Sequence, residues 1–119
     1  MMPAVMPEIL GESREGTCAR YRLRVPASLQ HFRDHFPRYP ILPGVVQLDW
    51  AVRLARRSFA GLEQSFAFDN FKCRAPIAPD TELELVLQHN AKRRSVSFEY
   101  TDRARGAVCS GTVLFGPPP

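Results

Sequence analysis

The chain has 119 residues, of which 45% are hydrophobic, so residues 1–119 suit one domain with a single core rather than two. Its formal net charge is +4, but the basic residues are scattered and form neither an aromatic-interleaved RNA motif nor a helix-turn-helix pattern, which disfavours nucleic acid as a partner. Apolar runs fall short of the roughly 20 residues of a membrane span, and the N-terminal segment lacks the pattern of a signal peptide, so we expect a cytoplasmic protein.

The N-terminal part of the chain predicts an arm followed by a strand. Residues 1–16 contain Pro, Gly and Glu without a regular hydrophobic pattern, so we expect a loose arm. Residues 17–25 alternate apolar side chains with arginines, which is typical of a half-buried strand with a basic outer face. The apolar positions of this strand are Ala19, Tyr21, Leu23 and Val25.

A proline-rich loop leads into a predicted helix. Pro37, Pro40 and Pro43 restrict the backbone of the loop, and Pro43 lies where proline suits the start of a helix. From Gly44 to about Ala60, apolar residues recur at spacings of three and four, which predicts a helix with one buried face. The predicted buried positions are Val45, Leu48, Val52, Ala55 and Phe59.

Four further segments have the composition of strands, and they are Ser65–Cys73, Glu82–Gln88, Ser95–Thr101 and Ala107–Phe115. The polar connections at 92–94 and 102–106 suit hairpin turns, so antiparallel neighbours are expected. The single predicted helix has to cover the apolar face of this sheet, which makes the fold class α+β. Residues 116–119, Gly-Pro-Pro-Pro, are expected to form a frayed, Pro-rich tail.

Two side chains near the start of the helix suit acid/base chemistry. His35 lies in the proline-rich loop, and a histidine is the natural base near neutral pH. Asp49 lies beside the apolar face of the helix, with Val45, Val46 and Val52 as its helical neighbours. Apolar surroundings favour the protonated form of a carboxyl group, which is the form that a general acid needs.

The segment from His35 to Trp50 resembles a known active-site motif. The 3-hydroxyacyl-[acyl-carrier-protein] dehydratases have the motif His-Phe-x-x-x-Pro-x-x-Pro-Gly, followed by an acidic residue on the central helix. This chain matches the motif with the family's separation of 49 − 35 = 14 residues, at His35, Phe36, Pro40, Pro43, Gly44 and Asp49. A second segment, residues 71–87, is similar to the family's second signature. Within this family, the segment PGVVQLDW most resembles the short dehydratases of bacterial aryl-polyene and related lipid clusters.

The resemblance implies a hotdog fold, in which a curved antiparallel sheet wraps around one long central helix. It also implies a homodimer or a higher oligomer of dimers, because in this family the histidine and the acid of one site come from different subunits. His35 would be the base at C2 of a 3-hydroxyacyl thioester, and Asp49 the acid at the C3 hydroxyl. The substrate would contact Phe36 and Pro43 and the amides of Gly44 and Val45. No cofactor or metal is implied.

One departure from the family concerns Arg53, which stands where relatives usually have Gln one helical turn after the acid. Arg53 could pair with Asp49, but we expect it to point to the rim of the helix. There it would join Arg56 and Arg57 in docking acyl carrier protein, because a basic surface attracts an acidic carrier. For any single arginine, an ordinary solvated position is the simpler interpretation.

Other interpretations of these residues stay open. A hotdog thioesterase would share the fold without needing the motif around His35, and a non-catalytic subunit that binds acyl chains or the carrier would retain the fold with an impaired site. His31 and His89 match no motif, so surface or packing roles are expected. Several phenylalanines could line an acyl tunnel but are more often core residues: Phe32, Phe36, Phe66, Phe68 and Phe71. The cysteines are odd in number and show no metal-ligand or disulfide spacing, so reduced structural thiols are expected at Cys18, Cys73 and Cys109.

Overall fold

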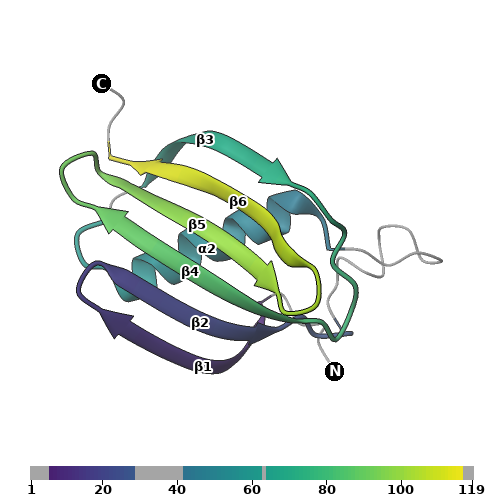
Figure 1. Ribbon diagram of the computed structural model, residues 1–119. Coiled ribbons are helices and arrows are strands. Elements are labelled where there is room, and N and C mark those ends of the chain that lie inside the picture. The colour runs from purple at the N-terminus through teal and green to yellow at the C-terminus, as the bar shows by residue number, and fades with distance from the viewer. Residues whose placement is uncertain (1–5, 29–41, 63, 117–119) are drawn as a thin grey trace.

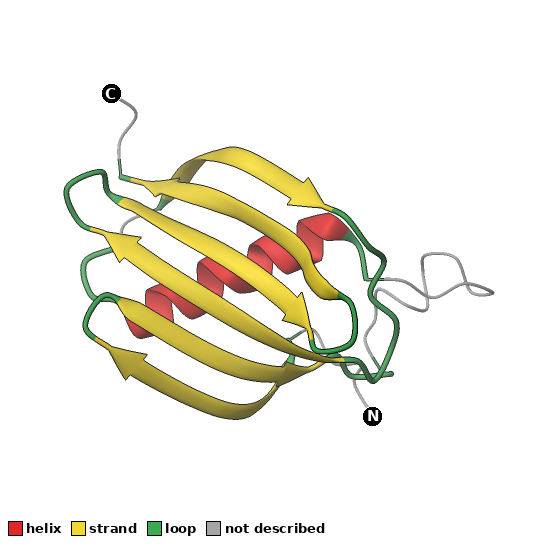
Figure 2. Ribbon diagram, in the orientation of Figure 1, coloured by secondary structure: helices red, strands yellow, loops and turns green. Residues whose placement is uncertain are grey.

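The computed structural model describes residues 6–28, 42–62 and 64–116, which form one antiparallel sheet and one helix (Figure 1). The elements are β1 (Glu8–Glu15), β2 (Cys18–Arg24), α2 (Gly44–Ser58), β3 (Ser65–Cys73), β4 (Glu82–Asn90), β5 (Ser95–Asp102) and β6 (Gly106–Phe115). Within the described residues the strands are ordered β1-β2-β4-β5-β6-β3, so β1 and β3 form the two edges. The helix crosses one face of the curved sheet (Figure 2).

The core lies between α2 and the central strands. Buried residues alternate with more exposed ones over residues 83–87 of β4 and 96–100 of β5, as the sequence pattern predicts. The buried rows are Leu83, Leu85 and Leu87 and Val96, Phe98 and Tyr100. The helix contributes Trp50 and Leu54 to the same core. The predicted α+β class and curved antiparallel sheet are confirmed. The helix has 15 residues, about 22 Å at 1.5 Å per residue, so it is of ordinary length rather than long.

The expectation of a loose arm over residues 1–16 was wrong for Glu8–Glu15, which form edge strand β1. This strand pairs with β2, and the register shifts between Ile9 and Gly11. Most of its side chains are exposed, because an edge strand against the end of the helix has little core to face. A strand without a buried side has no alternating pattern, so the sequence alone did not indicate it.

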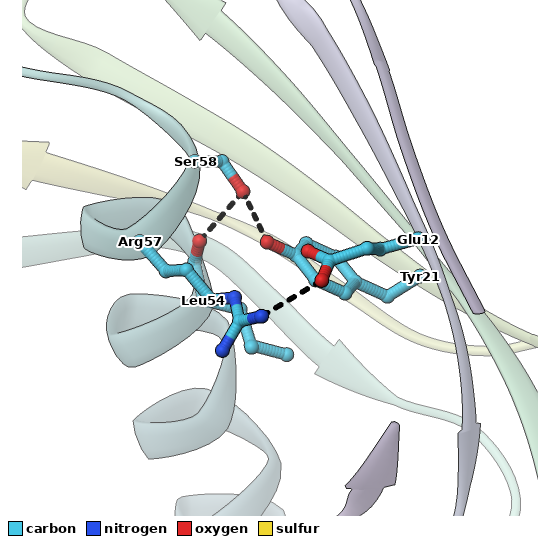
Figure 3. Close-up of polar contacts among 5 residues, drawn as sticks. All are labelled: Glu12, Tyr21, Leu54, Arg57 and Ser58. Carbon is cyan, nitrogen blue, oxygen red and sulfur yellow. Dashed lines mark hydrogen bonds and ion pairs between the residues drawn. The ribbon is translucent and has the colours of Figure 1, made fainter. Parts of the chain in front are cut away.

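The C-terminal end of α2 is tied to β1 and β2 by polar contacts (Figure 3). The Ser58 hydroxyl donates to the Leu54 carbonyl at 2.8 Å and lies 2.6 Å from the Tyr21 hydroxyl. Arg57 donates to Glu12 at 2.7 Å, and this bond and the charge of Glu12 raise the pKa of Arg57 above its ordinary value. The helix ends at Ser58, two residues before the predicted end. Within the described parts of the chain, no helix is long and apolar enough to cross a membrane.

Candidate active site

The first backbone amides of α2 have no partner among the described residues. Pro43 is extended, with φ −61° and ψ 144°, and no side chain of the described residues caps the helix there. The Pro43 carbonyl accepts from the amides of Val46 at 3.1 Å and Gln47 at 3.3 Å. The amides of Gly44 and Val45 donate no backbone hydrogen bond to another described residue, as expected for the first turn of a helix. Unpaired amides and the positive end of the helix dipole can polarise a carbonyl oxygen.

Two residues of β3 pack against this helix start. A Cβ added to Gly44 would lie 3.2 Å from Cys73 Sγ and 3.4 Å from the Phe71 ring, so a side chain there would crowd both neighbours. Phe71 was predicted as a possible tunnel residue; its ring lies beside Gly44, and the tunnel stays a prediction. Cys73 was predicted only as a structural thiol. Its position inside the segment similar to the second signature was the one signal that could have indicated its place beside Gly44.

Asp49 lies on the exposed face of α2, so the expectation of apolar surroundings is not met within the single chain. Arg53 Nε donates to Asp49 Oδ2 at 2.9 Å, and the two side chains are 58% and 50% exposed. The expectation that Arg53 points to the rim rather than pairing was therefore wrong. The cause is the i, i+4 spacing, which brings the guanidinium onto the carboxylate wherever no other group covers that face.

The exposure of Val45 also corrects the predicted buried face of the helix. It was placed among the buried positions, but its side chain is 69% exposed, whereas Leu48, Val52, Ala55 and Phe59 are buried as predicted. Val45, Asp49 and Arg53 are spaced four residues apart and form one exposed stripe, which we call the α2 stripe. Phe68 and Phe71 on edge strand β3 are exposed as well, at 54% and 39%. The chain thus combines an uncovered stripe with an edge strand that exposes aromatic side chains.

Tyr100 lies beneath the first turns of α2. Its hydroxyl donates to the Gln47 carbonyl at 2.5 Å, and its side chain is fully buried. Burial raises the pKa of Tyr100 well above its ordinary value, and the negative charge of Asp49 adds to this effect. Tyr100 therefore stays protonated and acts as a hydrogen-bond donor that fixes the helix to β5. The site is anchored on its other side by the Leu42 amide, which donates to the Ile77 carbonyl at 2.7 Å.

Several predicted residues lie outside the described residues. These are His35 and Phe36 of the motif, together with His31, Phe32, Pro37 and Pro40. The structure brings Pro43, Gly44, Val45 and Asp49 together on the first two turns of α2.

The three arginines predicted to dock the carrier are all exposed, and each has a neighbour. Arg53 pairs with Asp49, and Arg57 pairs with Glu12 at the far end of the helix. The Arg56 guanidinium lies over the Phe115 ring, 5.8 Å from its centroid. His89, for which a surface or packing role was expected, lies against Phe59, with ring centroids 4.9 Å apart and ring planes tilted by 35°.

A single helix packed across a curved antiparallel sheet, with its amide-bearing start opening onto the edge strand, is the arrangement of the hotdog fold. The chain matches the protein-family model "ApeI-like: ApeI dehydratase" over residues 11–112, and it belongs to this dehydratase family. The family resemblance of residues 35–50 is thereby confirmed.

The chain is similar to two proteins that are described as dehydratases and to one uncharacterized protein. The 3-hydroxyacyl-[acyl-carrier-protein] dehydratase FabZ of Clostridium perfringens (strain SM101 / Type A) is 26% identical over 122 residues, which cover 95% of this chain and 87% of the relative. The dehydratase heterocomplex ApeI:P from Xenorhabdus doucetiae contains a chain with a TM-score of 0.85 and 25% identity, covering 93% of this chain and 98% of that one. An uncharacterized protein from Erwinia carotovora subsp. atroseptica has a TM-score of 0.82 and 29% identity, with 94% and 97% covered.

Proposed function

We propose that this protein dehydrates a 3-hydroxyacyl thioester, carried on acyl carrier protein, to the trans-2-enoyl thioester and water. His35 removes a proton from C2, and Asp49 assists departure of the C3 hydroxyl, directly or through a bound water. The observation that carries this proposal is the membership of the chain in a dehydratase family over residues 11–112, with the motif intact from His35 to Asp49. We place the reaction in the cytoplasm, in fatty-acid or aryl-polyene synthesis.

The thioester carbonyl would bind at the start of α2. Removal of the C2 proton leaves negative charge on the thioester oxygen, and the amides of Gly44 and Val45 are available to stabilise it. The absence of a side chain on Gly44 supports this role, because Cys73 and Phe71 already pack closely at that position. Phe36 and Pro43 complete the proposed contacts with the acyl chain.

The ion pair between Asp49 and Arg53 bears on how Asp49 acts. A general acid has to carry a proton, whereas a guanidinium partner favours the charged form of a carboxyl group. We infer that the substrate or a second subunit displaces Arg53, because the pair is exposed and such pairs contribute only about 0–1 kcal/mol. Displacement of Arg53 would let Asp49 take up a proton, and the exposed Arg56 and Arg57 would attract the acidic carrier protein.

A second chain would complete the site. The exposed α2 stripe and the edge strand β3 support a dimer in which the histidine of one subunit meets Asp49 of the other. A homodimer is the simplest assembly. The similarity to a chain of the ApeI:P heterocomplex also makes a related but different dehydratase chain a suitable partner.

The test is to incubate the purified protein with 3-hydroxyacyl carrier-protein substrates of several chain lengths and to weigh the products. Loss of one water from the acyl carrier protein is expected. His35→Ala and Asp49→Asn should each lower kcat by about 10²–10⁴-fold without changing the melting temperature. Glu99→Gln, an exposed carboxylate on β5, is the matched control and should leave kcat unchanged. Free acid as the product would instead identify a thioesterase, and near-normal turnover by either site variant would falsify the assignment.

A second candidate is a subunit that supports a catalytic partner without turning over substrate itself. The ion pair between Asp49 and Arg53 favours this second candidate, because the pair engages the proposed acid. The same assay separates the two candidates when the partner dehydratase-like chain is added. If the complex is active, and if Asp49→Asn in this chain leaves the kcat of the complex unchanged, this chain is the supporting subunit.

A further inference from the structure

Cys73 and Cys109 are direct partners across two neighbouring strands. Cys73 is the last residue of β3, and the register pairs it with Cys109 on β6. Directly opposed residues of an antiparallel pair point to the same face of the sheet, so the two side chains meet. Cys73 is exposed, whereas Cys109 is buried at 1% exposure. Nothing in the proposed reaction uses either thiol.

The hydrogen-bond pattern shows that this pair suits a covalent link. The Arg74 amide donates to the Val108 carbonyl at 2.7 Å, so residues 74 and 108 form a hydrogen-bonded pair. The adjacent pair, Cys73 and Cys109, is therefore a non-hydrogen-bonded one, in which the Cα atoms typically lie about 4.5 Å apart. Disulfides bridge Cα separations of roughly 4.4–6.8 Å, so this pair needs no movement of the backbone.

We propose that Cys73 and Cys109 form a reversible intrachain disulfide that ties the end of edge strand β3 to β6 beside the start of α2. The pairing of β3 with β6 is interrupted between Asp69 and Lys72, where Asn70 has a φ of 53°. Beyond this irregularity only Lys72 and Cys73 of β3 resume the register. A disulfide at Cys73 fixes this short segment in place. The sulfur atom of Cys73 also packs against Gly44.

The link forms by exchange with a low-molecular-weight disulfide such as oxidised glutathione. The exposed thiolate of Cys73 attacks one sulfur of glutathione disulfide, which forms a mixed disulfide and releases one glutathione thiolate. The Cys109 thiol then attacks the Cys73 sulfur and releases the second glutathione, and the Cys109 proton leaves with it. Overall, two protein thiols are oxidised to one disulfide, and one glutathione disulfide is reduced to two thiols.

Cys18 provides an internal control. It lies on β2 opposite Glu15 and Gln88, so its register partners include no cysteine. The protein is equilibrated with glutathione buffers from reduced to oxidised, quenched with iodoacetamide and mapped by mass spectrometry. We expect a peptide linking Cys73 to Cys109, an alkylated Cys18, and loss of the link on adding dithiothreitol. Alkylation of both Cys73 and Cys109 in oxidised buffer, or a persistent glutathione adduct on Cys73, would overturn the proposal.

Two physical measurements test whether the disulfide restrains the end of β3, and neither depends on enzyme activity. The link closes a loop of 109 − 73 = 36 positions, so the oxidised protein should melt about 10–15 °C higher than the reduced one. Amide hydrogen exchange should also slow in peptides from the end of β3. Cys18→Ser should keep both effects, and Cys73→Ser should lose both. If the wild-type protein forms the link but melts and exchanges like its reduced form, the disulfide does not restrain β3 and the proposal is wrong.

Discussion

Asp49 and Arg53 show how one substitution changes the surroundings of a candidate catalytic group. The sequence places Asp49 beside apolar neighbours, but in the folded chain half of its side chain is exposed and Arg53 donates to it at 2.9 Å. Sequence spacing establishes that the two residues can meet. Whether they do depends on what else covers that face of the helix, and no described residue displaces the guanidinium from Asp49.

Removing the guanidinium should affect the chemical step. We expect Arg53→Gln to displace the pH profile of kcat, because the residue beside the proposed acid influences when that acid carries its proton. The salt dependence of kcat/KM should change little. Both constants are measured against pH and ionic strength for the variant and the wild type.

Arg56→Gln is the matched control for carrier docking. It should leave the pH profile of kcat in place and flatten the salt dependence of kcat/KM, since exposed charges act mainly on association. The opposite pattern, with Arg53→Gln altering only the salt dependence, would place Arg53 in docking and not beside the chemistry.

At the scale of elements, β3 and β6 are held together by close packing as well as by their ladder. Gly111 on β6 is buried, and a Cβ there would lie 2.9 Å from Phe98 Cζ and 3.3 Å from the Phe71 Cα. The backbone of β3 and the Phe98 ring thus occupy the space that a side chain would need. This contact fixes the position of Phe71, whose ring packs beside Gly44.

Gly111→Ala should therefore destabilise the fold by about 1–3 kcal/mol, the usual cost of overpacking a core. The free energy of unfolding is measured with urea. Gly11→Ala on β1 is the control, because nothing lies within 4 Å of its added Cβ. Equal stability of the two variants would show that the β3 backbone can move away from β6.

The β5–β6 hairpin depends on a carboxylate. Asp102 accepts from the Ala104 amide at 2.9 Å and from Arg105 Nε at 3.1 Å. The Ala104 bond, followed by the bond and charge of Arg105, lowers the pKa of Asp102 in the folded protein. A group with a lowered pKa stabilises the fold above its unfolded value of about 3.9, and the contribution is lost as the pH falls through the folded pKa.

Asp102→Ala should cost about 1 kcal/mol at pH 7, and the difference from the wild type should shrink below about pH 4. Urea unfolding at a series of pH values measures this. Asp102→Asn keeps an acceptor for the Ala104 amide but has no charge to titrate, so it should recover part of the stability. A loss in Asp102→Ala that is constant from pH 7 to pH 3 would show that the charge of Asp102 is not involved.

At the scale of the whole molecule, the described chain leaves the proposed site open. The α2 stripe faces outward, and β3 ends the sheet with two exposed phenylalanines. Such a surface is unusual for a monomer and suits a second chain, because an unpaired strand edge with aromatic side chains is prone to association.

Mixing inactive variants tests whether the site is shared. In a dimer of His35→Ala with Asp49→Asn, one of the two sites would contain both intact residues, so about half of the wild-type activity per dimer is expected. Tagging each variant differently allows the mixed dimer to be isolated. Wild-type homodimers and the two parent homodimers are the controls. If the isolated mixed dimer assembles but stays inactive, histidine and acid do not come from different subunits.

Much of the fold could be predicted from the sequence because it follows from local periodicity. Alternation along residues 82–88 and 95–101 marks two central strands, and the spacing of three and four marks α2, since each backbone geometry repeats along the chain. The motif from His35 to Asp49 likewise gave the family, because its residue types and spacings are a property of the chain alone.

Tertiary structure alone decided which surfaces are covered. Edge strand β1 lacks a buried side, and Val45 belongs by pattern to the apolar face of α2 yet lies outside the core. The meeting of Cys73 with Cys109 depends on the register of strands far apart in sequence. Local patterns specify how the backbone repeats, whereas burial and pairing depend on distant segments, and those contacts exist only once the chain has folded.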